Sequence, residues 1–215
     1  MAQIRPFHAI RPEKTVADRV AALPYDVYNR SEAKEETKRE PLSFLRIDRA
    51  ETQMADEIDT YAPEVYDKAL EIFEQMQADG IYIPDPDEAY YIYQLTMDGR
   101  TQTGIAALAS VDDYLSGAIK KHENTREEKE QDRIRHVDTL SAQTGPIFLA
   151  YRANTVINQI IGEVMEQDAP LYDFVSPDGI GHRMWKIQGE IPVQQIQEAF
   201  AGISDIYIAD GHHRA

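Results

Sequence analysis

The dipeptide Asp98-Gly99 restricts the fold of this chain more than any other feature. It separates two runs with strand character, residues 89–97 and 101–110. An Asp-Gly pair between such runs is a strong signal for the two-residue turn of a β-hairpin, because both turn positions need a positive φ. We therefore expect an antiparallel strand pair near the middle of the chain.

A strong helix signal precedes this hairpin at residues 63–79. Pro63 suits the first turn of a helix, and Gly80 suits the C-terminal cap. The apolar residues between them recur at helical spacing and form one stripe: Val65, Ala69, Ile72, Phe73 and Met76. One face of this helix is therefore expected to be buried.

Helix and strand signals alternate along the rest of the chain. Expected strands are residues 4–10, 42–47, 147–151, 171–175, 184–187 and 203–209; expected helices are 31–39 with Ser31 as cap, 125–140 with a Thr125/Glu128 capping box, 155–165 after Asn154, and 192–200. The mixture predicts an α+β (mixed α/β) fold over a single region, residues 1–215. We expect a helix to follow the last strand and its glycine turn, so that the sequence is the N-terminal part of a longer protein.

Composition excludes several classes of protein. The 22 basic and 38 acidic residues give a formal net charge of −16, which disfavours nucleic acid and anionic membranes as partners. The acidic surplus is also explained by solubility alone. With no cysteine, disulfides and thiolate chemistry are excluded. No apolar run is long enough to span a bilayer and no secretory signal begins the chain, so the cytoplasm is the expected location.

The residues Asp210, Gly211, His212, His213 and Arg214 form the strongest candidate site. An apolar strand delivers a glycine, which permits a tight turn, and polar side chains follow at once. If a helix begins here, its free N–H groups form an anion site. Arg214 would then bind phosphate, and Asp210 would orient a histidine ring or hold a divalent metal.

Two other interpretations of this terminal motif remain open. It can be an ordinary turn with a chance cluster of polar residues. It can also be a metal site made by the two histidines and Asp210, although adjacent histidines in an extended segment point to opposite sides.

The pair His122-Glu123 is the second candidate site, and it follows Lys120-Lys121. A carboxylate beside a histidine and two lysines can act as a general base toward a hydroxyl group. The alternative is a solvated loop of charged residues.

The third candidate is a stripe of basic residues on the helix expected after Thr125. Its members are three, four and three residues apart and so share one face: Arg126, Lys129, Arg133 and His136. They could line an anion cleft, or they could pair with the neighbouring acidic residues on a solvated helix.

Several segments together resemble a known family. The residues 4–7, 24–27, 99–104, 120–125 and 133–136 and the Asp-Gly-His-His-Arg sequence are similar to the bacterial and archaeal family called domain of unknown function 1015. The terminal motif, residues 208–215, also resembles the phosphate-binding motif of the ParB/sulfiredoxin-like superfamily, and most closely that of the free serine kinases that use ADP. The resemblance covers the whole chain.

This resemblance implies a function. It suggests a nucleotide-dependent phosphotransferase acting on a small hydroxyl metabolite, with ADP or ATP and Mg²⁺ as cofactors. Residues 210–214 would hold the donor phosphates, and Glu123 beside His122 would accept the hydroxyl proton. In this hypothesis the basic stripe, from Arg126 to His136, would stabilise charge. In the serine kinases a proline precedes the His-Glu pair, whereas Lys121 stands there in this chain. The alternatives are a ParB-type nucleotide-binding regulator without phosphoryl transfer, and a phosphate-ester hydrolase.

Overall fold

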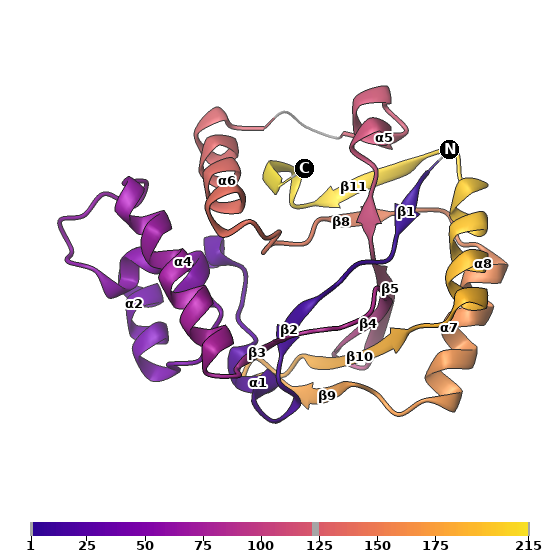
Figure 1. The fold of residues 1–215 in the computed structure, drawn as a ribbon, viewed down its shortest axis with the longest axis horizontal. Coiled ribbons are helices and arrows are strands. Elements are labelled where there is room, and N and C mark those ends of the chain that lie inside the picture. The colour runs from indigo at the N-terminus through magenta and orange to yellow at the C-terminus, as the bar shows by residue number, and fades with distance from the viewer. Residues whose placement is uncertain (1, 122–124, 215) are drawn as a thin grey trace. The chain divides into compact units, whose positions relative to one another are not determined.

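The computed structural model describes residues 2–121 and 125–214. It is mixed α+β, as predicted. The chain divides into two compact units, and the element labels below are those of Figure 1. Unit 1 comprises Met1–Ala9, Pro84–Thr125 and Pro146–Ala215, and unit 2 comprises Ile10–Ile83 and Arg126–Gly145.

Unit 1 contains most of the strands. Its elements are β1 (Ile4–Arg5), β4 (Tyr90–Met97), β5 (Arg100–Ala106), β6 (Leu108–Ala109), α5 (Val111–Ser116), β7 (Ile119–Lys120), β8 (Phe148–Ala150), α7 (Thr155–Gln167), β9 (Tyr172–Val175), β10 (Gly181–Ile187), α8 (Glu190–Ala201), β11 (Ile206–Asp210) and the 3-10 turn η4 (His212–Arg214).

The larger sheet of unit 1 is antiparallel, with strand order β5-β4-β10-β9. The predicted hairpin is confirmed: β4 and β5 pair from Tyr91–Ala106 to Met97–Arg100. Asp98 and Gly99 form the turn with φ values of 51° and 76°. Both values are positive, which is the requirement that made this dipeptide informative.

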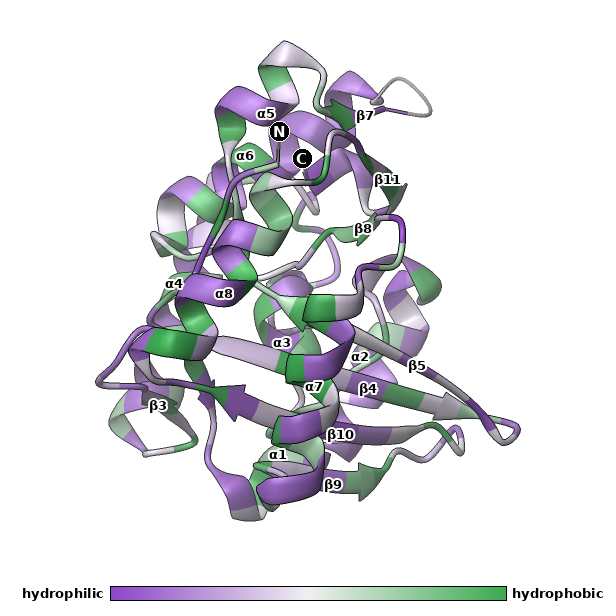
Figure 2. Cartoon of the chain, turned by 90° about the vertical axis from the view of Figure 1, so that its right-hand side faces the viewer, coloured by the Kyte–Doolittle hydropathy of each residue, from purple (hydrophilic) through white to green (hydrophobic). Residues whose placement is uncertain are grey.

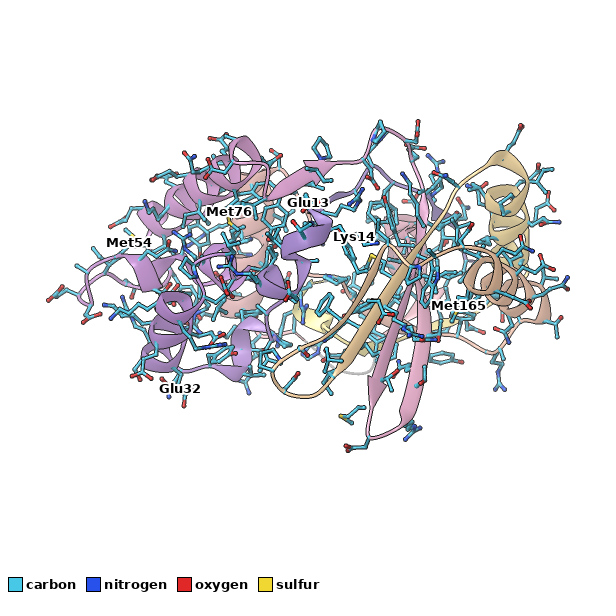
Figure 3. The ribbon with its side chains drawn as sticks, turned by 90° about the horizontal axis from the view of Figure 1, so that it is seen from below. Glu13, Lys14, Glu32, Met54, Met76 and Met165 are labelled. Atoms are coloured by element: carbon cyan, nitrogen blue, oxygen red, sulfur yellow. The ribbon has the colours of Figure 1, made fainter. Side chains whose placement is uncertain are left out.

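One face of this sheet packs against two helices, α7 and α8. Tyr90, Ile92 and Trp185 of the sheet share a buried core with Ile157 of α7 and Ile196 of α8. Apolar and polar segments alternate along both helices in Figure 2. Met165 of α7, labelled in Figure 3, packs partly buried against this core. The predicted cap is also confirmed, because Asn154 accepts hydrogen bonds from the amides of Val156 and Ile157.

Unit 1 also has a two-stranded sheet, β1-β6, and a three-stranded sheet of order β7-β11-β8, whose strands are labelled in Figure 2. The central strand β11 is parallel to β7 and antiparallel to β8. Ile206 and Ile208 of β11 are buried, and Ile206 belongs to the same core as α7 and α8. This sheet carries the terminal motif at the end of β11.

Unit 2 is mainly helical. Its elements are β2 (Ile10–Pro12), η1 (Lys14–Val16), α1 (Ala17–Val20), η2 (Tyr25–Val27), α2 (Arg30–Arg39), α3 (Leu45–Asp48), η3 (Ala50–Gln53), α4 (Pro63–Ala78), β3 (Tyr82–Pro84, whose last residue belongs to unit 1) and α6 (Glu127–Leu140). Strands β2 and β3 pair with each other.

The core of unit 2 forms around α4, the helix with the strongest sequence signal. Pro63 is its first residue, and Gly80 just beyond its end has a φ of 72°. Ile72, Phe73 and Met76 of the predicted stripe are buried in one cluster, and Figure 3 shows Met76 among the side chains there. The prediction for this helix is therefore confirmed.

The expected strand at residues 42–47 is wrong, because the segment contains the helical turn α3. The alternation of Leu45, Arg46 and Ile47 suggested a strand. The two apolar side chains instead fill separate clusters, Leu45 with Tyr25 and Ile47 with the α4 core. Residues two apart on a helix point about 200° apart, so one helical turn serves both clusters.

Other elements differ in their boundaries. The expected strand 4–10 is two strands, β1 and β2, and α2 is capped by Asn29 rather than Ser31. Helix α6 begins at Glu127 with Arg126 as N-cap residue, so the Thr125/Glu128 capping box does not start it. Among the described residues, no helix combines the length and apolarity needed to cross a bilayer.

Candidate functional site

The terminal motif begins where β11 ends. Gly211 follows the strand with a φ of 78°, in the left-handed region that glycine adopts without strain. The chain then forms the single 3-10 turn η4, closed by a hydrogen bond of 2.8 Å from the Arg214 amide to the Gly211 carbonyl. The expected strand, glycine and turn are therefore all present in this order.

The side chain of Arg214 folds back over Gly211. A β-carbon placed on Gly211 would lie 3.4 Å from both Cζ and Nε of Arg214. The guanidinium Nη1 donates to the Pro146 carbonyl over 3.1 Å, and the described residues supply no other partner for this side chain. Most of its five N–H groups thus remain available to an anion.

Asp210 and the two histidines complete the motif. Asp210 is exposed and lies opposite Phe148 of β8. The rings of His212 and His213 have centroids 4.0 Å apart, because η4 is a helical turn rather than the extended segment assumed for adjacent histidines. Within residues 2–121 and 125–214, no three ligand-type side chains gather in a way that could hold a metal ion.

Strand β7 lies directly beside the strand that carries the motif. The parallel register pairs Ile119 with Ile206 and Lys120 with Tyr207, and the Lys120 ammonium binds the Asp205 carboxylate at 2.9 Å. Parallel neighbours run about 4.8 Å apart and end at the same edge of a sheet. The C-terminal end of β7, Lys120, therefore lies at the same end of the sheet as that of β11, although Lys120 is opposite Tyr207, three residues before Asp210. His122 and Glu123 themselves lie outside the described residues.

The basic stripe belongs to unit 2, on α6. Arg126 is exposed and Lys129 is half-buried, whereas Arg133 and His136 are buried. A fully solvated helix, one of the two interpretations of this stripe, does not agree with the burial of its last two members.

Arg133 is held by carboxylates and an aromatic ring. Its guanidinium binds Asp132 at 2.9 Å and Asp48 at 3.5 Å, and it lies 4.4 Å from the centre of the Tyr25 ring. Asp132 also accepts a hydrogen bond of 2.9 Å from the Tyr66 hydroxyl. These contacts satisfy a buried charge, as burial requires.

His136 is buried in its neutral form. Nε2 donates to the Ile47 carbonyl over 3.2 Å, which leaves Nδ1 to accept from the Thr144 hydroxyl at 3.3 Å. Burial, and next the charge of Arg133, lower the pKa of His136 to about 4. This histidine therefore connects α6 to α3 and adds no positive charge at neutral pH.

Lys129 lies near two tyrosines. Its ammonium donates to the Tyr61 hydroxyl over 3.1 Å and is 5.9 Å from the centre of the Tyr25 ring. The hydrogen bond to Tyr61 raises the pKa of Lys129. On the neighbouring side of α6 there is a depression of about 180 Å³, lined by Tyr61, Tyr66, Glu128, Gln131, Asp132 and Arg135.

This tyrosine cluster is not predictable from the sequence pattern. Tyr25 belongs to residues 24–27, one of the segments that resemble the family, but the sequence does not indicate a role for this segment. In the structure, Arg49 donates to the carbonyls of Tyr25 and Tyr28 at 3.0 and 2.9 Å and fixes this loop. The ring of Tyr25 is then in position to pack against Arg133.

Comparison with known proteins identifies the family. The family described as "Protein of unknown function (DUF1015)" matches residues 4–215. The chain belongs to this family. No curated protein and no solved structure matches it. The DUF1015 match thus confirms the family part of the resemblance, and the chemistry must be argued from the residues.

Proposed function

We propose that this DUF1015 protein is a nucleotide-dependent phosphotransferase that phosphorylates a small hydroxyl metabolite. The observation that carries the proposal is the parallel pairing of β7 with β11. Because the two strands are parallel, the segment that follows β7 and the segment that follows β11 both begin at the same end of the sheet. The first contains the candidate base, and the second contains the candidate phosphate site. A base and a donor phosphate must lie close together for phosphoryl transfer.

The terminal motif supports the phosphate-binding part of the proposal. Gly211 adopts the left-handed conformation that this tight turn needs, and the turn brings the Arg214 side chain back over the glycine. Arg214 presents guanidinium N–H groups over it, of which only Nη1 has a partner among the described residues, and such groups bind phosphate oxygens in pairs. The superfamily resemblance assigns the same residues, 210–214, to the donor phosphates.

The proposed step is direct transfer to the acceptor oxygen. Glu123, beside His122, takes the proton of the acceptor hydroxyl as that oxygen forms a bond to the terminal phosphorus of ADP or ATP. The bond from this phosphorus to the bridging oxygen breaks, and AMP or ADP leaves with the bond electrons. Arg214 stabilises the charge on the transferred group, which is the main requirement of such reactions.

The residues present suit Mg²⁺ bound mainly through the nucleotide. The exposed Asp210 carboxylate offers an oxygen ligand at the edge of the motif, and Mg²⁺ usually combines one or two carboxylates with phosphate oxygens and water. When bound, the ion would neutralise phosphate charge.

The experiment is a phosphoryl-transfer assay with ADP or ATP, Mg²⁺ and a panel of hydroxyl metabolites that includes free serine. We expect nucleotide consumption that depends on the acceptor and falls at least a hundredfold in Glu123→Gln. Nucleotide binding without consumption would replace the proposal with a ParB-type regulator. Phosphate release without any acceptor would replace it with a hydrolase. Unchanged turnover in Glu123→Gln would remove the assigned base.

A further inference from the structure

The sheet β7-β11-β8 has one buried face and one exposed face. Ile119, Ile206 and Ile208 are buried on the first. On the second, two aromatic rings are open to solvent: Phe148 of β8 is 48% exposed and Tyr207 of β11 is 45% exposed. Large aromatic side chains are usually buried, so two of them on one open face are a notable feature.

The strand register places the two rings on the same face. Tyr207 lies opposite Ala150, and residues directly opposite each other project from the same side of a sheet. Phe148 is two residues from Ala150 along β8 and so shares its side. Phe148 and Tyr207 are therefore diagonal neighbours; in a regular antiparallel pair such residues lie about 7 to 8 Å apart, with their β-carbons somewhat closer.

This face is continuous with the candidate phosphate site. Phe148 lies opposite Asp210, and a register irregularity between Ile208 and Asp210 adjusts β11 just before the motif. Pro146 and Ile147, which precede Phe148, lie close to the terminal motif. The Pro146 carbonyl binds Arg214, and the α-carbon of Ile147 is 3.5 Å from the position of a β-carbon on Gly211.

We propose that Phe148 and Tyr207 form the platform on which the base of the bound nucleotide stacks. This inference rests on the proposed function, since it assigns the base of the nucleotide whose phosphates residues 210–214 hold. A nucleotide has a polar phosphate end and a flat base. Arg214 would bind the phosphates, and the rings of Phe148 and Tyr207, on the neighbouring strands β8 and β11, would contact the base. Ala150, which lies opposite Tyr207, is small and exposed.

Stacking does not distinguish one base strongly from another, because every base has a π-face. The platform therefore predicts a preference for nucleotides over inorganic polyphosphates, with modest discrimination among purine nucleotides. Lys120, which lies beside Tyr207, already binds Asp205, so the face adds little charge of its own.

The test compares ADP with inorganic pyrophosphate, each with Mg²⁺, by isothermal titration. The proteins are the unmodified chain, Phe148→Leu, Tyr207→Leu and the double variant. Tyr93→Leu is the control, since Tyr93 is an exposed tyrosine of the four-stranded sheet in unit 1. We expect the double variant to bind ADP at least tenfold more weakly and pyrophosphate with unchanged affinity. Phe148→Tyr should keep the affinity for ADP, which separates stacking from a structural role.

Each other outcome overturns the inference in a recognisable way. Equal affinity for ADP and pyrophosphate in the unmodified chain, or ADP binding unaffected by the double variant, would remove the platform. Equal weakening of both ligands would show that the face only supports the fold of the motif. After any of these three outcomes, the assignment of residues 210–214 as a phosphate site would still hold if the unmodified chain bound pyrophosphate and Arg214→Ala did not. Binding of neither ligand by the unmodified chain would contradict both the platform and the proposed function.

Discussion

Gly211 joins two requirements at a single position. Its φ of 78° suits glycine, and a β-carbon there would meet Arg214 on one side and Ile147 on the other. A methyl group at this position would thus strain the left-handed backbone, and it would fill the space against which the guanidinium lies, in van der Waals contact with it. The sequence predicted the first effect, since glycine after a strand indicates a turn. The second depends on the path of Arg214 and required the structure.

Gly211→Ala should destabilise the protein and weaken phosphate binding together. A left-handed conformation costs an alanine about 1 to 2 kcal/mol. Urea denaturation would measure that loss, and titration with pyrophosphate would measure the binding. The control is Gly104→Ala on β5, where no φ in the left-handed range occurs and no atom lies within 4 Å of the added carbon. Full pyrophosphate affinity in Gly211→Ala would contradict the assigned position of Arg214.

His136 shows how a residue chosen for charge can have another role. The helical spacing placed it correctly on the same face of α6 as Arg133. Spacing cannot reveal burial, however, and the ring lies at 3% exposure between the Ile47 carbonyl and Thr144. Its pKa of about 4 follows from that burial.

The lowered pKa of His136 predicts a loss of stability in acid. The unfolded chain binds a proton on this ring below about pH 6.5, whereas the folded chain resists protonation down to about pH 4. The free energy of unfolding should therefore fall as the pH drops through this window, by roughly 3 kcal/mol from this group. His136→Gln keeps a donor for the Ile47 carbonyl but does not titrate.

Urea denaturation of both proteins at intervals from pH 7 to pH 4 would check this. Arg133 and Asp48, which face the ring, are present in both, so their contributions largely cancel in the difference. The stability advantage of the unmodified protein over His136→Gln should shrink as the pH falls. An advantage that is constant across the range would show that the ring is not protonated on unfolding.

At the scale of elements, prediction succeeded where a local signal and the tertiary packing agree. The Asp98-Gly99 hairpin and the helix after Pro63 combine turn or cap chemistry with a matching apolar period. Prediction failed at residues 42–47, where the two apolar side chains belong to different clusters. A short alternation of apolar and polar residues does not show whether its apolar side chains are buried in one cluster or in two.

The cap of α7 gives a direct test at this scale. Asn154 accepts from two amides at the start of the helix, so Asn154→Ala should cost about 1 kcal/mol in the free energy of unfolding. Ser110→Ala is the matched control, because Ser110 is the N-cap of α5 and makes no cap hydrogen bond within the described residues. Chemical denaturation of both variants would contradict the assignment if their losses of stability were equal.

At the scale of the whole molecule, the two largest apolar cores among the described residues are separate. The cluster around α4 and the cluster around α7 and α8 share no residue, and each lies within one unit. The sequence alone did not predict this division. Unit 2 is formed by two segments, 10–83 and 126–145, and only long-range contacts such as those between α4 and α6 join them.

Separate cores predict separate responses to core substitutions. Ile72→Ala removes buried volume from the α4 cluster and should lower its stability by about 2 to 5 kcal/mol. Hydrogen exchange followed by mass spectrometry should show faster exchange in α4 and α6, with α7 and α8 little changed. Ile157→Ala in the other cluster should give the reverse pattern. The same acceleration throughout the chain in both variants would indicate a single cooperative unit.

The candidate site illustrates what the sequence could and could not supply. It identified residues 210–214 and the His122-Glu123 pair, but their separation along the chain left their relation open. The pairing of β7 with β11 supplies that relation for the strands leading to them, through contacts between residues far apart in sequence. No local pattern predicts which distant strands pair.

Nucleotide binding through Arg214 can be measured by isothermal titration of the protein with ADP and ATP in the presence of Mg²⁺. Arg214→Ala is compared with the unmodified chain and with Arg100→Ala, which removes an exposed arginine from the tip of the hairpin in the same unit. We expect a nucleotide to bind to the unmodified chain and to Arg100→Ala. Arg214→Ala should bind the same nucleotide at least tenfold more weakly. Equal binding by all three proteins, or no binding by any, would contradict the proposed phosphate site.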